Sequence, residues 1–74
     1  MWKKGKGTTN EHTYRWVVKA FEEPSEYGIE EGCISILWVA VDGKEVASYS
    51  RGWDMKPGTK LAKDIVKKLL KEYN

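Results

Sequence analysis

Polar and apolar residues alternate through residues 13–21, which read Thr-Tyr-Arg-Trp-Val-Val-Lys-Ala-Phe. Tyr14, Trp16 and Val18 fall on one face of an extended chain, since successive side chains point to opposite sides. Alternation with β-branched and aromatic residues predicts a strand with one face more buried than the other. Pro24 ends this segment, because proline cannot donate a hydrogen bond to a neighbouring strand.

Two further strands are predicted on either side of the dipeptide Asp42-Gly43. Residues 33–41 form the most apolar stretch of the chain, and residues 44–50 again favour an extended conformation. Asp-Gly is typical of a two-residue hairpin turn, which needs positive φ at both positions. Such a turn also fixes the register, so Trp38 is expected opposite Ala47.

A helix is predicted over residues 59–73. Its apolar residues recur at helical spacing and form one continuous stripe. Thr59 follows the Pro57-Gly58 break and is a suitable N-cap. Lysines cover the opposite side: Lys60, Lys63, Lys67, Lys68 and Lys71.

These elements predict an α+β fold, a three-stranded and mostly antiparallel sheet in the order β-β-β-α with the C-terminal amphipathic helix on one face. Residues 12–74 form the single domain. Residues 1–11 are rich in lysine and glycine without periodicity, which predicts a flexible basic N-terminal arm. One helix covers one face, yet both hairpin faces are substantially apolar. The second face is therefore expected to be covered by the N-terminal arm, by the 22–32 loop, by another copy of the chain or by another protein, and a homodimer or a partner protein is favoured over coverage by the chain itself.

Composition sets limits on function. The chain has 74 residues, 13 of them basic and 11 acidic, so its net charge of +2 is too balanced to indicate nucleic acid. Only the distribution of charge would make that case. The basic N-terminus has no apolar segment after it and does not resemble a signal peptide. A single cysteine, Cys33, forms no internal disulfide, which favours a reducing, cytoplasmic location.

The connector Tyr49–Gly58 reads YSRGWDMKPG. Glycine and proline account for its turns, but not for Arg51, Trp53 and Asp54. We expect Trp53 to turn inward onto the core. Together with the tyrosine of the long 22–32 loop, these residues form the candidate partner-binding site: Tyr27, Arg51, Trp53 and Asp54.

An alternative site would bind nucleic acid. It uses lysines of the helix and of the N-terminal arm, which are Lys60, Lys63, Lys67 and Lys71 with Lys3, Lys4 and Lys6. Aromatic side chains on an open sheet also stack nucleic-acid bases. However, the candidates Tyr14, Trp16, Trp38 and Tyr49 alternate in phase with aliphatic neighbours, which favours core positions.

Catalytic residues are scarce. His12 is the single histidine, and with Cys33 it supplies two metal ligands at best. A nucleophilic pair of Cys33 and His12 would need a cleft that a domain of this size rarely has. The sequence therefore predicts no enzyme, no cofactor and no metal site.

Three motifs carry a resemblance to a known family: Ser25-Glu-Tyr-Gly-Ile29, Gly32-x-Ile34-Ser35 and Tyr49-x-Arg51-Gly52-Trp53-Asp54. Over residues 14–73 the chain resembles very small, functionally uncharacterised proteins of bacteria, largely Firmicutes, and of their phages. It departs from that pattern at Cys33, where a basic residue is usual, and at Ile36, where lysine is expected. The resemblance implies a phage or mobile-element setting and no known catalytic activity.

The sequence thus favours a small non-enzymatic binding module that acts through protein–protein contacts, and the resemblance implies that it is a phage or mobile-element accessory protein. Nucleic-acid binding by the lysines is the alternative.

Overall fold

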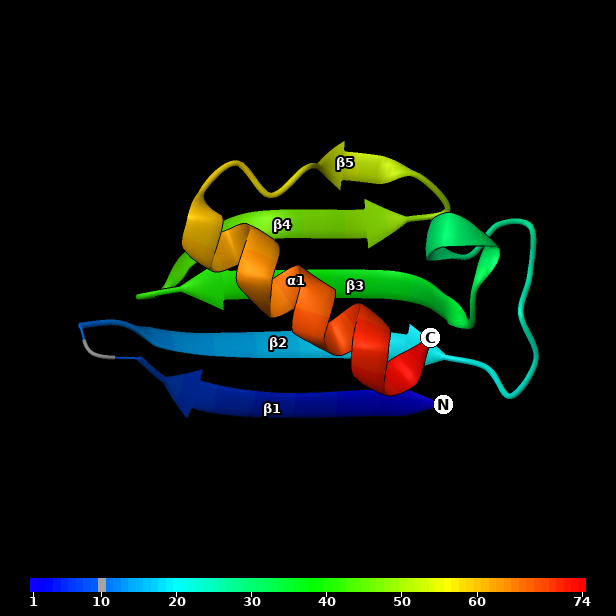
Figure 1. Ribbon diagram of the computed structural model, residues 1–74, viewed down its shortest axis with the longest axis horizontal. Coiled ribbons are helices and arrows are strands. Elements are labelled where there is room, and N and C mark those ends of the chain that lie inside the picture. Colours follow the sequence, from blue (N-terminus) through cyan, green and yellow to red (C-terminus); the bar gives the residue numbers. More distant parts are fainter. Residues whose placement is uncertain (10) are drawn as a thin grey trace.

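The computed structural model describes residues 1–9 and 11–74, in which five antiparallel strands lie in the order β1-β2-β3-β4-β5 with α1 across one face (Figure 1). The elements are β1 Trp2–Thr8, β2 Thr13–Ala20, a short 3-10 helix Ile29–Glu31, β3 Ile34–Val41, β4 Lys44–Ser50, β5 Trp53–Met55 and α1 Lys60–Tyr73. The helices in this described part are too short and too polar to cross a membrane.

The fold is α+β, but the expected three-stranded sheet is wrong. Residues 2–8, predicted as part of a flexible arm, pair along their whole length with β2. Residues 53–55 of the connector add β5 beside β4. Asn10, also within the predicted arm, lies outside the described residues. Counted over residues 1–9 and 11–74, the sheet therefore has an additional strand at each edge.

The glycines of β1 explain why this segment pairs. Gly5 lies opposite Trp16 and Gly7 lies opposite Tyr14. A Cβ atom on Gly5 would come within 2.6 Å of the Trp16 ring. Aromatic side chains of β2 thus occupy the space above the glycines, a recognised way of stabilising glycine in an edge strand.

The core lies between α1 and the face of the sheet that it covers. Val18, Leu37 and Val39 of the central strands are completely buried there. The helical stripe supplies Ala62, Ile65, Val66 and Leu69. Thr59 caps the helix, since its Oγ1 accepts a hydrogen bond from the Ala62 backbone N–H at 3.1 Å. Helix position, helix stripe and N-cap are as predicted.

Asp42 and Gly43 form the predicted turn, with φ of 51° and 81°. The register differs from the prediction, because a bulge follows the first two residue pairs of the hairpin. Trp38 consequently lies opposite Ser48 and not opposite Ala47. The bulge moves Ala47 into the core, while alternation along β3 places Trp38 on the face of the sheet away from α1.

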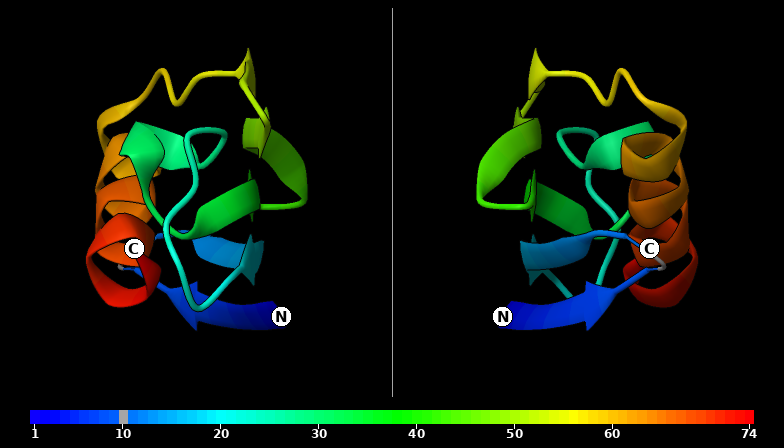
Figure 2. Two further views of the ribbon diagram at one scale, coloured as in Figure 1. Left: turned by 90° about the vertical axis from the view of Figure 1, so that its right-hand side faces the viewer. Right: turned by 90° about the vertical axis from the view of Figure 1, so that its left-hand side faces the viewer.

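This second face has no helix or loop over it among the residues that the structure describes (Figure 2). Alternation along the strands and the observed register assign its residues. We call it the open face, and it comprises Trp2, Lys4, Lys6 and Thr8 of β1, Thr13, Arg15, Val17 and Lys19 of β2, Ile36, Trp38 and Ala40 of β3, and Glu45, Ser48 and Ser50 of β4.

The loop between β2 and β3 is held at one end of the sheet by Asn74, the C-cap of α1. The Asn74 side-chain amide donates to the Ile29 carbonyl and accepts from the Ile34 N–H, both at 3.0 Å. Ile29 itself is buried in the core. The loop is thus anchored at both the helix and the sheet.

Candidate functional site

Basic side chains gather on the open face. Lys4 and Lys6 come from β1, and Arg15 and Lys19 come from β2; we call these four residues the basic patch. Residues 2–8 and 13–20 contain no Asp or Glu, so no carboxylate within these two strands neutralises the patch.

Lys6 lies directly opposite Arg15 in the β1–β2 register. Lys4, opposite Val17, is a diagonal neighbour of Arg15 on the same face. Like charges directly opposite each other destabilise a sheet. The free protein thus carries an unfavourable concentration of positive charge, which a bound anion would relieve.

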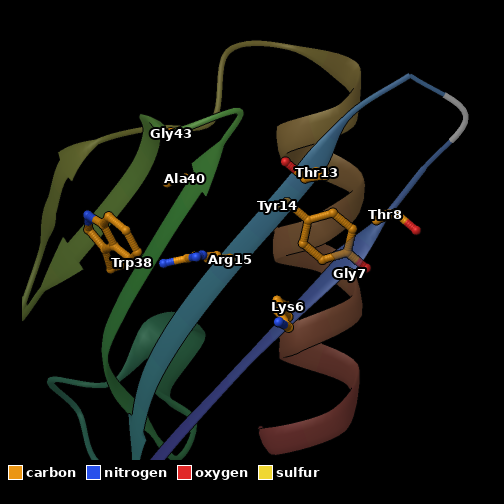
Figure 3. A pocket seen from close by; sticks show the side chains of 9 residues that line it. All are labelled: Lys6, Gly7, Thr8, Thr13, Tyr14, Arg15, Trp38, Ala40 and Gly43. Atoms are coloured by element: carbon orange, nitrogen blue, oxygen red, sulfur yellow. The ribbon is translucent and has the colours of Figure 1, made fainter.

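A depression of about 850 Å³ lies beside the patch, lined by nine residues that include Lys6, Arg15 and Trp38. A second one of about 500 Å³ is lined by Lys4, Lys6, Arg15 and Trp38 with three further residues of β1 and β2. Figure 3 shows the Arg15 side chain extending from β2 toward the indole of Trp38. The surface therefore combines an aromatic ring with several cations.

The indole of Trp38 is held in place by Glu45. Its Nε1–H donates to the Glu45 carboxylate at 2.6 Å. Because indole has no other hydrogen-bond donor, what Trp38 offers a ligand is its ring. The half-buried Trp38 is thus a fixed apolar surface next to the Arg15 guanidinium.

Another aromatic group lies at the far end of the basic patch. Trp2 and Phe21 are 58% and 49% exposed. The Lys19 ammonium is 5.6 Å from the Trp2 ring centroid and 5.3 Å from that of Phe21, within cation–π range. Lys19 thus sits between two accessible rings.

The predicted partner-binding residues meet only in part. The Arg51 guanidinium lies 5.8 Å from the ring of Tyr27, which is 58% exposed. Trp53 is half-buried and packs inward, edge-on against Tyr49, with ring centroids 5.2 Å apart. The Tyr49 hydroxyl in turn donates to the Tyr27 carbonyl at 3.0 Å. Asp54 is exposed on β5.

The predicted lysine surface is divided between two sides of the molecule. The helix lysines Lys60, Lys63, Lys67 and Lys71 are exposed on α1, on the far side from the open face (Figure 2). Lys4 and Lys6 lie on the open face, while Lys3, opposite Val18, alternates to the other side. The lysines of the arm and of the helix therefore do not share one face of the molecule.

His12 and Cys33 are far apart. The His12 Nδ1 donates to the Asp42 carboxylate at 2.6 Å, beside the β3–β4 turn. This hydrogen bond, with a second from the Thr13 backbone N–H, lowers the pKa of Asp42. Cys33 comes just before Ile34, the first residue of β3, whereas Asp42 follows the last residue of that strand. At about 3.3 Å per residue, the eight residues of β3 hold Cys33 and the His12–Asp42 pair roughly 26 Å apart. The hypothesised nucleophilic pair is therefore not assembled, and the described residues hold no cluster of three metal-ligating side chains.

The prediction from the sequence missed Arg15, Lys19 and Trp38 as surface residues, and it left Trp2 unplaced. The alternation Lys4-Gly5-Lys6-Gly7 was an available signal for a strand with lysines on one face. Pairing that strand with residues 13–20 would have brought Lys6 and Arg15 together.

The sequence matches a protein-family model described as Domain of unknown function (DUF7678) over residues 1–74. No curated protein and no solved structure matches the chain. The description of the family states no activity, so a function has to be argued from the geometry of the open face.

Proposed function

Because the chain belongs to this family of unknown function, we propose a role from its structure: it binds nucleic acid through the open face, without catalysing a reaction. The observation that supports this role is the basic patch on an uncovered sheet face, with Lys6 opposite Arg15 and the Trp38 ring beside them. A phosphate backbone supplies the repeated negative charge that such a patch attracts.

The spacing of the charges favours a polyanion over a single small anion. Adjacent strands lie about 4.8 Å apart and residues about 3.4 Å apart along a strand, so the four cations spread over about 14 Å from Lys6 to Lys19, farther than one small anion reaches. Each of the other three lies within about 8 Å of Lys4, which is inside the Debye length of roughly 10 Å at 0.1 M salt. The acidic loop that begins at Glu22 starts about 23 Å from Arg15 along β2 and is largely screened from it, whereas it starts about 10 Å from Lys19, where it reduces the positive potential. Glu45 reduces the potential locally, and its carboxylate is engaged by the Trp38 indole.

The same charges disfavour the homodimer expected from the sequence. In a symmetric dimer the same patch of both copies meets. Two basic patches would then face each other, with like charges removed from water. We therefore do not assign the open face to a second copy of the chain.

The test compares charge removal on the two sides of the molecule. The variant Lys6→Gln/Arg15→Gln alters the open face, and Lys63→Gln/Lys67→Gln makes the same change in net charge on α1. Binding to a fluorescein-labelled 12-nucleotide strand is followed by anisotropy between 50 and 200 mM salt. If each of the four cations meets a phosphate, the wild-type slope of log K against log salt is about −2.8.

We expect the open-face variant to bind at least tenfold more weakly at 50 mM salt, with a slope near −1.4 after the loss of two contacts. The helix variant should stay within about twofold of wild type. An equal loss of affinity in both variants would show that binding depends on the net charge of the protein or on α1, and not on the open face. No binding by the wild-type protein at low salt would refute the proposed function.

Protein contact remains a second candidate, at a different place. Exposed tyrosine and arginine are the residue types that most often anchor protein interfaces, and Tyr27 and Arg51 form an exposed pair. Arg51 also adopts a positive φ of 61°, a strained conformation that concentrates at functional sites. An accessory role in a phage or mobile element is retained as a proposal. The double variant Tyr27→Ala/Arg51→Ala should leave oligonucleotide binding unchanged and should abolish capture of a protein partner.

A further inference from the structure

We infer that the nucleic acid bound by the open face is single-stranded, and that its unpaired bases stack on Trp38 and on the Trp2–Phe21 pair. This inference rests on the proposed function and specifies its ligand. It depends on the aromatic rings of the open face, whereas the proposed function depends on the basic patch.

Trp38 has the properties of a stacking platform. Its Nε1–H is already bonded to Glu45, so the ring meets a ligand through its apolar surface. The ring lines both depressions beside Lys6 and Arg15. A base stacked there would place its own phosphates next to these two cations, as in proteins that bind single strands.

The second platform lies within reach of the same strand. Trp38, on β3, lies opposite Val17 of β2, and Trp2, on β1, lies opposite Lys19 of β2. Two strand spacings and two residues along the strand separate them by about 12 Å. Lys4 and Lys19 lie between the platforms, so the phosphates linking two stacked bases would cross cationic side chains.

A duplex does not fit this arrangement. Its bases are paired and stacked on each other, and their faces are closed to protein rings. Duplex readers instead place a helix or a two-stranded ribbon in a groove. Trp38 stands on β3, the middle strand of the sheet, where the grooves of a duplex do not reach its ring.

The test uses matched substitutions of Trp38. Trp38→Phe keeps an aromatic ring, and Trp38→Leu keeps an apolar side chain without one. Each protein is titrated with fluorescein-labelled 12-nucleotide RNA and DNA as single strands and as duplexes. Inorganic polyphosphate serves as an unlabelled competitor that has phosphates but no bases, and thermal unfolding checks that each variant is folded.

We expect single strands to bind at least tenfold more tightly than duplexes of the same sequence. Trp38→Leu should weaken single-strand binding about tenfold, and Trp38→Phe should weaken it by less than threefold. Neither substitution should change the inhibition constant of polyphosphate, which reports its own affinity for the protein. Trp2→Ala should weaken single-strand binding at least threefold. The RNA and DNA arms identify the preferred strand, and either preference supports the inference.

Two results would overturn it. Duplex binding as tight as single-strand binding would do so, as would equal losses for single strands and polyphosphate in Trp38→Leu. In either case the proposed function stands if Lys6→Gln/Arg15→Gln still weakens binding. Glu45→Gln keeps an acceptor for Trp38 and removes the negative charge, so it should raise affinity for strands and polyphosphate alike.

Discussion

The indole of Trp16 lies over Gly5 of the neighbouring strand, in the space that a side chain at position 5 would need. The same indole packs against Tyr73 of α1, with ring centroids 5.5 Å apart. Trp16 thereby joins the edge strand β1 to the helix. Because β1 carries Lys4 and Lys6, this contact also positions half of the basic patch.

Gly5→Ala should destabilise the protein by about 1–3 kcal/mol, the usual effect of overpacking, because the new methyl group would overlap the Trp16 ring. Oligonucleotide affinity should fall as well, although no charge is lost, since β1 is displaced. Gly52→Ala is the matched control, with no atom within 4 Å of its added Cβ. Urea unfolding measures the difference, and equal stability of the two variants would contradict the role assigned to Trp16.

Trp53→Ala should lower the free energy of unfolding by about 2 kcal/mol. Fully buried aromatic truncations cost about 3–5 kcal/mol, and Trp53 is half-buried against Tyr49. Met55→Ala, on the same strand and 41% exposed, should change stability little. Unchanged stability with lost capture of a protein partner would instead make Trp53 a contact residue.

Asn74→Ala should destabilise the protein by about 1–3 kcal/mol, because it leaves the Ile34 N–H and the Ile29 carbonyl without partners in a partly buried place. Asn74→Asp keeps the acceptor for the Ile34 N–H and loses the donor to the Ile29 carbonyl, so its stability should fall between those of the wild type and the alanine variant. Chemical denaturation ranks the three proteins. An alanine variant as stable as wild type would show that these two hydrogen bonds do not control the loop.

The His12–Asp42 contact predicts a pH dependence of stability. Its hydrogen bonds lower the pKa of Asp42 in the folded protein below the ordinary value of about 3.9. The contribution of Asp42 is therefore complete above that value and is lost as the pH falls through the lower folded pKa. Asp42→Asn, which tolerates the positive φ of this turn, should be less stable than wild type at pH 5 and approach it toward pH 2. A constant difference across that range would contradict the prediction.

Local patterns predicted the three central strands and α1, because their stabilising contacts follow regular periods in the sequence. The edge strands escaped prediction for a physical reason. β1 depends on Gly5 meeting the ring of Trp16, a residue of another strand. β5 has three residues and rests on the contact of Trp53 with Tyr49. Neither interaction leaves a periodic signal in its own segment.

The candidate site was harder to predict than the fold. Lys4 and Lys6 were proposed as nucleic-acid contacts, but together with helix lysines that lie on the other side of the molecule. The surface position of Trp38 depends on which face of β3 is covered by α1, and alternation within residues 33–41 does not reveal it because both faces of this strand are apolar. The bulge in the β3–β4 pairing, which the turn sequence Asp42-Gly43 does not reveal, places Ala47 and Tyr49 in the core, because a single residue of register changes the face of the side chains that follow.

The most direct test of the open face as the binding surface is an NMR titration of the ¹⁵N-labelled protein with an unlabelled 12-nucleotide single strand at low salt. The side-chain N–H signals of Trp38 and Arg15 report on the open face, and the backbone amides of Lys63 and Lys67 report on α1. We predict large shift changes for Trp38 and Arg15 and small ones along α1. Changes confined to α1, or no changes at all, would contradict the account.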